Sequence, residues 1–143
     1  MKITGINPTV ITSQYDDAIK LFESLGFEIH HHSDYIDERV PVSTRLKNED
    51  GFIIDINKSD KFPHDITLIR INVDNFDECY QMFKEHGFKN VAGEDHTVDV
   101  PHFKGAHMIS PSGFNVMAMQ HIKEEKHYEN HNFQPINCNC TFL

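Results

Sequence analysis

Apolar and polar residues alternate in short runs along most of the chain, a period of two that is typical of half-buried strands. Two longer runs, YDDAIKLFESLGF at 15–27 and FDECYQMFKEHGF at 76–88, have their apolar residues at helical spacing instead. Gly26 and Gly87 follow the last apolar turn of each run, a position where glycine commonly ends a helix. The pattern therefore predicts two helices among many strands, as in the α+β class.

The two helical runs are copies of one another, separated by 76 − 15 = 61 residues. A second pair of segments, EDGFIIDIN at 49–57 and PSGFNVMAM at 111–119, repeats after 111 − 49 = 62 residues. The chain thus contains one module twice, and each copy has the predicted order β-α-β-β-β. We expect one domain over residues 1–122, built from repeats at about 3–60 and 65–122, followed by a polar tail at 123–143.

The boundaries of the predicted elements follow from the alternation and from turn residues. Ser13 and Asp74 are the expected first caps of the two helices. Loops are expected at 33–41 and 93–101, and the linker between the modules at 58–65. Strands are expected at 3–12, 27–32, 42–47 and 52–57 in the first module, and at 66–73, 88–92, 102–109 and 114–120 in the second.

Composition narrows the class of partner. With 22 acidic and 13 basic residues, the formal net charge is −9, which argues against binding to nucleic acid or to an acidic membrane surface. No segment approaches the roughly 20 apolar residues of a membrane span, and the N-terminus lacks the apolar core of a signal peptide. Three cysteines without a framework spacing favour a reducing, cytoplasmic location.

Paired β-α-β-β-β modules resemble the vicinal oxygen chelate superfamily, the group of glyoxalase I, bleomycin-resistance proteins and extradiol dioxygenases. The resemblance rests on SLGFEI at 24–29, on SPSGFNVMAM at 110–119 and on the internal repeat, and it covers roughly residues 3–122. It implies that the two modules form a cup-shaped mixed sheet with the helices outside and a small ligand inside.

The resemblance also implies where a metal site would lie, since family members place one ligand on the first strand and one on the last strand of each module. In this chain the first-strand positions fall at Gly5 or Ile6 and at Leu68, and the last-strand positions at Asp55 and Met117. Among these side chains, Asp55 alone could bind a metal, and one carboxylate does not hold a catalytic divalent ion. We therefore expect no metal and no cofactor.

If the alternation holds, polar and apolar side chains face the cup together, a mixture that suits an organic molecule with an anionic or hydrogen-bonding group. Arg45 and His107 occupy equivalent positions in the two modules. The candidate ligand-binding residues are Asn7, Thr9, Arg45, Asp55, Arg70, Asn72, His107, Asn115, Met117 and Met119.

Structural alternatives stay open for these residues. Arg70 and Asp55 could form an ion pair across the sheets, His107 could be a hydrogen-bonded strand residue, and the two methionines could be core filler. For three further groups we expect no functional role. Cys79 is expected to be a buried thiol, and the histidines at 30–32 are expected to be solvated. Cys138 and Cys140, with a tail histidine such as His131, are expected to belong to a disordered tail.

Two functions are consistent with these residues. The first is a metal-independent protein that binds a small organic molecule in the cup, as a homodimer. The second is an enzyme, a glyoxalase-like lyase or isomerase that uses Asp55 or His107 as its acid or base. A metalloenzyme with non-standard ligands, in which His107, Asp55 and a tail histidine converge, is a third arrangement.

Overall fold

The computed structural model describes residues 1–34 and 40–122 of the 143-residue chain. Two compact units emerge, and each contains most of one predicted module. The first unit is Asn7–Ile69, and the second combines Met1–Ile6 with the chain from Arg70 onward. The boundary therefore passes through two strands, β1 (Ile3–Thr12) and β5 (Ile66–Val73), so each strand contributes one end to each unit.

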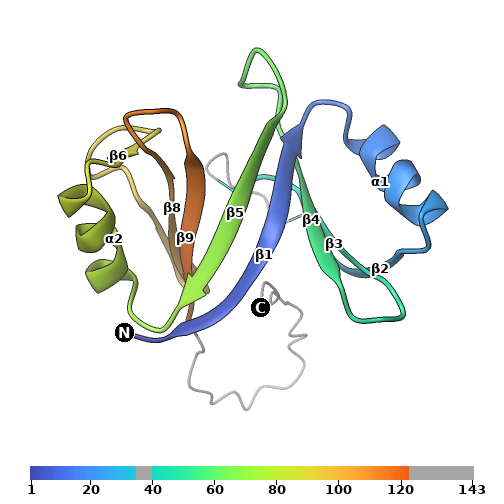
Figure 1. The fold of residues 1–143 in the computed structure, drawn as a ribbon, viewed down its shortest axis with the longest axis horizontal. Helices are drawn as coiled ribbons and strands as arrows, with labels where there is room; N and C mark the ends of the chain where they lie inside the picture. Colours follow the sequence, from blue (N-terminus) through green and yellow to red (C-terminus); the bar gives the residue numbers. More distant parts are fainter. Residues whose placement is uncertain (35–39, 123–143) are drawn as a thin grey trace. The chain divides into compact units, whose positions relative to one another are not determined.

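In the first unit, a four-stranded mixed sheet carries one helix. Its strands are hydrogen-bonded in the order β2-β3-β4-β1, with β4 parallel to β1 and the other pairs antiparallel. The helix α1 (Tyr15–Ser24) contacts β2, β3 and β4 of the same unit (Figure 1). The remaining strands are β2 (Glu28–Ser33), β3 (Ser43–Lys47) and β4 (Ile53–Lys58).

The second unit repeats this plan. Its strands follow the order β5-β9-β8-β6, and the short β7 pairs with the free part of β8. The helix α2 (Phe76–Glu85) contacts β8 and β9 (Figure 1). The strands after the helix are β6 (Lys89–Asn90), β7 (Val98–Val100), β8 (Phe103–Ile109) and β9 (Asn115–His121). The α+β class and the two β-α-β-β-β modules are thus confirmed.

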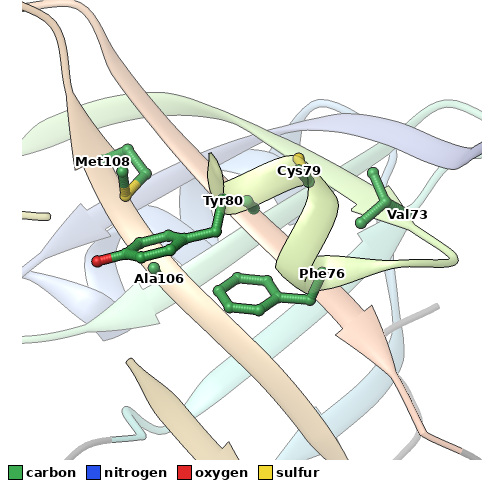
Figure 2. Packing of buried hydrophobic residues seen from close by; sticks show 7 residues of the cluster. Val73, Phe76, Cys79, Tyr80, Ala106 and Met108 are labelled. Carbon is green, nitrogen blue, oxygen red and sulfur yellow. The ribbon is translucent and has the colours of Figure 1, made fainter. Parts of the chain in front are cut away.

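Each unit has a hydrophobic core between its helix and one face of its strands. In the second unit, Phe76 and Tyr80 of α2 stack with ring centroids 5.5 Å apart, and Ala106 and Met108 of β8 belong to the same cluster (Figure 2). Cys79 lies there too, so the predicted buried thiol is confirmed. In the first unit the core residues are Tyr15, Leu46, Ile54 and Ile56, with Ala18, Ile19 and Phe22 of α1 packed against them.

The helix ends differ in detail from the sequence expectations. Gly26 and Gly87 have φ values of 99° and 87°, the left-handed backbone predicted for residues that end a helix. The first caps are shifted by one residue. Gln14 is the N-cap residue of α1, and its side chain makes no capping hydrogen bond. Asn75 is the N-cap residue of α2, and its side chain accepts a hydrogen bond from Glu78 N.

One other expectation is wrong, and a second holds only in part. Val98–Val100, assigned to a loop, forms β7 because it pairs with β8. Of the three histidines at 30–32, which were expected to be solvated, His30 and His32 are exposed, whereas His31 is half-buried and pairs in register with Arg45 after a strand irregularity.

Candidate functional site

The strands of the first unit present one face to α1 and the other away from it. Leu46, Ile54 and Ile56 point toward the helix and form its core. Their strand neighbours therefore point to the opposite face, because successive side chains alternate. We call this opposite side the first polar face. Its buried polar members are Asn7, Thr9, Ser43, Arg45, Asp55 and Asn57.

Pairing between strands brings these side chains together. Thr9 of β1 is the register partner of Asp55 of β4, and Asp55 is also the register partner of Arg45 of β3. Three adjacent strands thus place a hydroxyl, a carboxylate and a guanidinium side by side. Asn57 lies one pleat further along β4, between Ile11 of β1 and Ser43 of β3.

Asp55 is the centre of this cluster, and its two oxygens are occupied. Arg45 Nε donates to Asp55 Oδ1 at 2.8 Å, and Arg45 Nη2 donates to Oδ2 at 3.0 Å. Asn7 Nδ2 donates to the same Oδ2 at 2.7 Å. The side chains of Arg45 and Asp55 are 8% and 2% exposed, so this is a buried, bidentate, charge-assisted pair.

His31 borders the same cluster as the register partner of Arg45. Burial lowers the pKa of His31, and the positive charge of Arg45 lowers it further. The imidazole is therefore neutral at pH 7, and protonating it would place a second cation beside the Arg45 guanidinium.

In the second unit, the strands have the same two-sided arrangement. Ala106 and Met108 of β8 and Ala118 of β9 belong to the core under α2. The alternate residues face away from the helix, and cross-strand pairing joins His107 to Met117. We call this side the second polar face. It carries Arg70, Asn72, His107, Asn115, Met117 and Met119.

His107 is fixed by a neighbour on β9. Its Nε2 lies 2.8 Å from Asn115 Oδ1, the distance of a hydrogen bond in which the ring N–H donates. Burial lowers the pKa of His107, and the hydrogen bond to Asn115 raises it by a smaller amount. His107 is therefore neutral at pH 7, the state that a general base requires.

Arg70 and Asn72 lie on the same strand face, two residues apart on β5. Arg70 Nε donates to Asn72 Oδ1 at 3.2 Å, and both residues are buried. Asn72 also packs close to Gly5, where an added Cβ would lie 3.2 Å from Asn72 Nδ2. The Asn72 side chain thus orients the Arg70 guanidinium along the second polar face.

The four positions to which the family resemblance assigns metal ligands can now be compared with the fold. Asn7, rather than Gly5 or Ile6, is the first-strand residue that contacts Asp55, while Ile6 is 61% exposed. Within residues 1–34 and 40–122, no three His, Cys, Asp or Glu residues gather as metal ligands would. Cys138, Cys140 and His131 lie outside the described residues.

All ten candidate ligand-binding residues lie on faces that point away from the helices, as the alternation predicts. The first polar face brings together Asn7, Thr9, Arg45 and Asp55; the other six share the second polar face. The bidentate partner of Asp55 is Arg45, a pairing the sequence analysis did not foresee.

Asn57 and Ser43 were missing from the candidate list, although they share the first polar face. Their place in the alternation, two residues from Asp55 and Arg45, was the available signal.

Comparison with known proteins identifies the fold. No family model and no curated protein sequence matches the chain. Among solved structures, glyoxalase I from Zea mays superposes with a TM-score of 0.62 at 12% identity, over 85% of this chain and 44% of that chain. Methylmalonyl-CoA epimerase from Mycobacterium tuberculosis gives a TM-score of 0.60 at 12% identity, over 85% and 90%.

A glyoxalase/bleomycin resistance protein/dioxygenase superfamily member from Vibrio splendidus 12B01 gives a TM-score of 0.50 at 17% identity, over 83% and 99%. This chain spans less than half the length of the Zea mays enzyme. At these identities the similarity establishes the fold and leaves the activity open.

Proposed function

Because the chain has the vicinal oxygen chelate fold, we propose that it is a small-molecule-binding protein that works without a metal ion. The ligand is held on strand faces that point away from the helices, where the fold gathers its buried polar side chains. The proposal places the protein with the bleomycin-resistance members of the superfamily rather than with its metalloenzymes.

The observation that carries this proposal is the state of Asp55. Its carboxylate already accepts at least three hydrogen bonds, two of them from Arg45 and one from Asn7. A divalent ion would have to displace a guanidinium that stays charged at any accessible pH. It would also sit within a few ångströms of that cation, in a buried site where repulsion is weakly screened. The Asp55 carboxylate is therefore better suited to stabilising the fold than to binding a metal ion.

Ligand chemistry follows from the surrounding side chains. Met117 and Met119 are flexible apolar members of the second polar face, where His107 pairs with Met117 across the strands and Arg70 is a further polar member. Apolar contact combined with a few fixed polar groups suits a small organic molecule.

The test combines metal analysis with ligand screening. Elemental analysis of protein purified without chelator should find substoichiometric zinc, nickel and manganese, and calorimetric titration with each ion should give no one-to-one binding. A thermal-shift screen of organic compounds in EDTA should then find ligands that raise Tm. Stoichiometric metal that disappears in Asp55→Asn would refute the metal-free proposal. No compound raising Tm at millimolar concentration would refute the binding role.

An enzymatic role is the second candidate, and the neutral state of His107 favours it. Burial lowers the pKa of the imidazole, and Asn115 fixes the ring, so His107 could take a proton from a bound substrate. Asp55 is a poorer base, since its lone pairs are engaged by Arg45. This candidate is a glyoxalase-like lyase or isomerase in which His107 replaces the metal.

Proton exchange tests this candidate directly. Loss of carbon-bound hydrogen from 2-oxo acids and thioesters into D2O would be followed by NMR with the wild-type protein. Catalysed exchange should disappear in His107→Gln and persist in His86→Gln, a matched change at an exposed histidine on the end of α2. Exchange that survives His107→Gln would eliminate this mechanism.

Partners and location complete the proposal. Within residues 1–34 and 40–122, no helix is long and apolar enough to span a bilayer. We propose a cytoplasmic homodimer, and several large apolar side chains outside the cores, such as Leu25 at 61% and Phe52 at 68% exposed, are available for contact with a second copy. Sedimentation equilibrium would show a single species of twice the 16.6 kDa chain mass, and a monomer at micromolar concentration would contradict the dimer.

A further inference from the structure

Two buried polar atoms on the first polar face have no hydrogen-bond partner in the described part of the chain. They are Thr9 Oγ1 and Asn57 Oδ1. Thr9 is fully buried and Asn57 is 6% exposed. A buried polar atom that lacks a partner is costly, because it loses its hydrogen bonds to water on folding. Native proteins contain few such atoms, and each calls for an explanation such as a functional role or a bound ion or water.

The two atoms belong to one patch of the first unit. Thr9 is the register partner of Asp55, and Asn57 follows Asp55 by two residues on the same strand. Asp55 and Asn57 therefore point to the same side, about 6.6 Å apart along β4. Ile11, also buried, is the register partner of Asn57 and provides an apolar neighbour.

The two charged side chains next to this patch, Arg45 and Asp55, form an ion pair with each other. Asp55 is neutralised by the bidentate contact with Arg45, and Asn7 engages the same carboxylate. A charged ligand group would gain little from this pair and would lose its own hydration. Asn57 Oδ1 can only accept a hydrogen bond, whereas the Thr9 hydroxyl can donate or accept. The complementary group is therefore neutral and carries a hydrogen-bond donor.

We propose that Thr9 and Asn57 form a subsite that recognises a neutral hydroxyl or amide group of the ligand, with Ile11 contacting its apolar body. This inference rests on the proposed small-molecule-binding function and specifies the ligand class. The ligand donates an O–H or N–H to Asn57 Oδ1, and its oxygen accepts from the Thr9 hydroxyl. Carboxylates and simple ketones lack the donor and bind weakly.

Four monosubstituted benzenes of similar size provide the probes. Benzamide and benzyl alcohol carry a neutral donor, acetophenone carries an acceptor alone, and benzoate carries a negative charge. Each would be titrated to millimolar concentration against 15N-labelled protein, with the backbone and side-chain amide signals of Asn57 as the readout. The two donors should shift these signals and bind about tenfold more tightly than acetophenone, the difference expected for one good hydrogen bond.

Thr9→Val separates a ligand-binding hydroxyl from a structural one. The substitution removes an unpaired hydroxyl at nearly constant shape, so Tm should stay unchanged or rise, while the preference for benzyl alcohol over acetophenone should disappear. Thr12→Val is the matched control on the same strand. Thr12 is also buried, but its Oγ1 accepts from Gln14 N at 2.8 Å, so its loss should lower Tm and leave probe binding intact.

Several results would overturn the inference. One is equal affinity for acetophenone and benzamide, and another is the absence of any shift of the Asn57 signals with all four probes. A third is a Tm loss in Thr9→Val as large as in Thr12→Val, which would indicate that a fixed water satisfies the hydroxyl. The proposed function fails separately, when no compound of any class binds the protein in the broader thermal-shift screen.

Discussion

Replacing Arg45 by Met tests how much the first polar face depends on its buried ion pair. The substitution keeps much of the side-chain volume but leaves the Asp55 carboxylate buried without its guanidinium partner, while Asn7 still donates to it. Removing one partner of a buried pair typically costs about 3–5 kcal/mol, because an uncompensated charge remains. Since domains of this size are stable by about 5–15 kcal/mol, Arg45→Met should lower Tm by roughly 10–25 °C.

The double variant Arg45→Met/Asp55→Asn shows whether this loss reflects the unpaired charge. The introduced amide can still accept from Asn7, and neither position of the former ion pair carries a charge. Stability should therefore recover to within about 1–2 kcal/mol of wild type, giving a coupling energy of several kcal/mol in a double-mutant cycle. Urea denaturation at pH 7, followed by circular dichroism, measures all four proteins.

A surface pair provides the control. Lys104 Nζ lies 3.6 Å from Asp77 Oδ2, and these side chains are 31% and 79% exposed. Lys104→Met should cost less than about 1 kcal/mol, because an exposed ion pair is well solvated in both states. If Arg45→Met also cost less than 1 kcal/mol, or if the double variant were no more stable than Arg45→Met, the ion pair would not organise this face.

Three further predictions concern titratable groups. Burial lowers the pKa of His31 and His107, so the unfolded chain binds more protons than the folded chain below about pH 6.5. The free energy of unfolding should therefore fall as pH decreases through that range, and the fall should be smaller in His31→Gln. An unchanged dependence of the free energy of unfolding on pH in that variant would exclude the effect. Burial raises the pKa of Tyr15, whose hydroxyl contacts Thr44. An alkaline absorbance titration should therefore contain a late component that Tyr15→Phe removes. Burial likewise raises the pKa of the Cys79 thiol; with the tail cysteines changed to serine, disulfide reagents should react slowly until denaturant is added, and fast native reaction would contradict the burial.

The fold was predictable to the extent that local pattern determines it. The alternation of polar and apolar residues on β5 predicted opposite faces for Arg70 and Ile71, and the internal repeat made His107 the counterpart of Arg45. The structure places each of these side chains on the face expected from the sequence. The strand face packed on a helix is apolar and the opposite face is largely polar, so side-chain direction can be read from the chain. Glycines at the helix ends were equally informative, since few other residues adopt positive φ.

Interactions between distant segments were not predictable in the same way. The partner of Asp55 depends on how β4 aligns with β1 and β3, and a slip of one residue exchanges the faces. Asn7 was therefore missed as the first-strand contact of Asp55. The strand β7 was missed because three residues carry too short a pattern, and pairing with β8 alone makes them a strand.

Helix starts were displaced by one residue for a related reason. Asp74 is a good cap by type, but its carboxylate accepts from Lys2 N at 2.7 Å, which leaves Asn75 to cap α2. The backbone of Lys2, just before β1, thus takes the acceptor that the helix start would otherwise use.

The central claim, metal-free binding of a small organic molecule, is tested most directly by NMR titration of EDTA-treated, 15N-labelled protein with the best compound from the thermal-shift screen. The account predicts saturable shifts on the strand faces that point away from the helices, among them Thr9 and Asn57, with an affinity unchanged by added zinc, nickel or manganese. Binding that appears only after one equivalent of metal is added, and that is lost in Asp55→Asn, would contradict it.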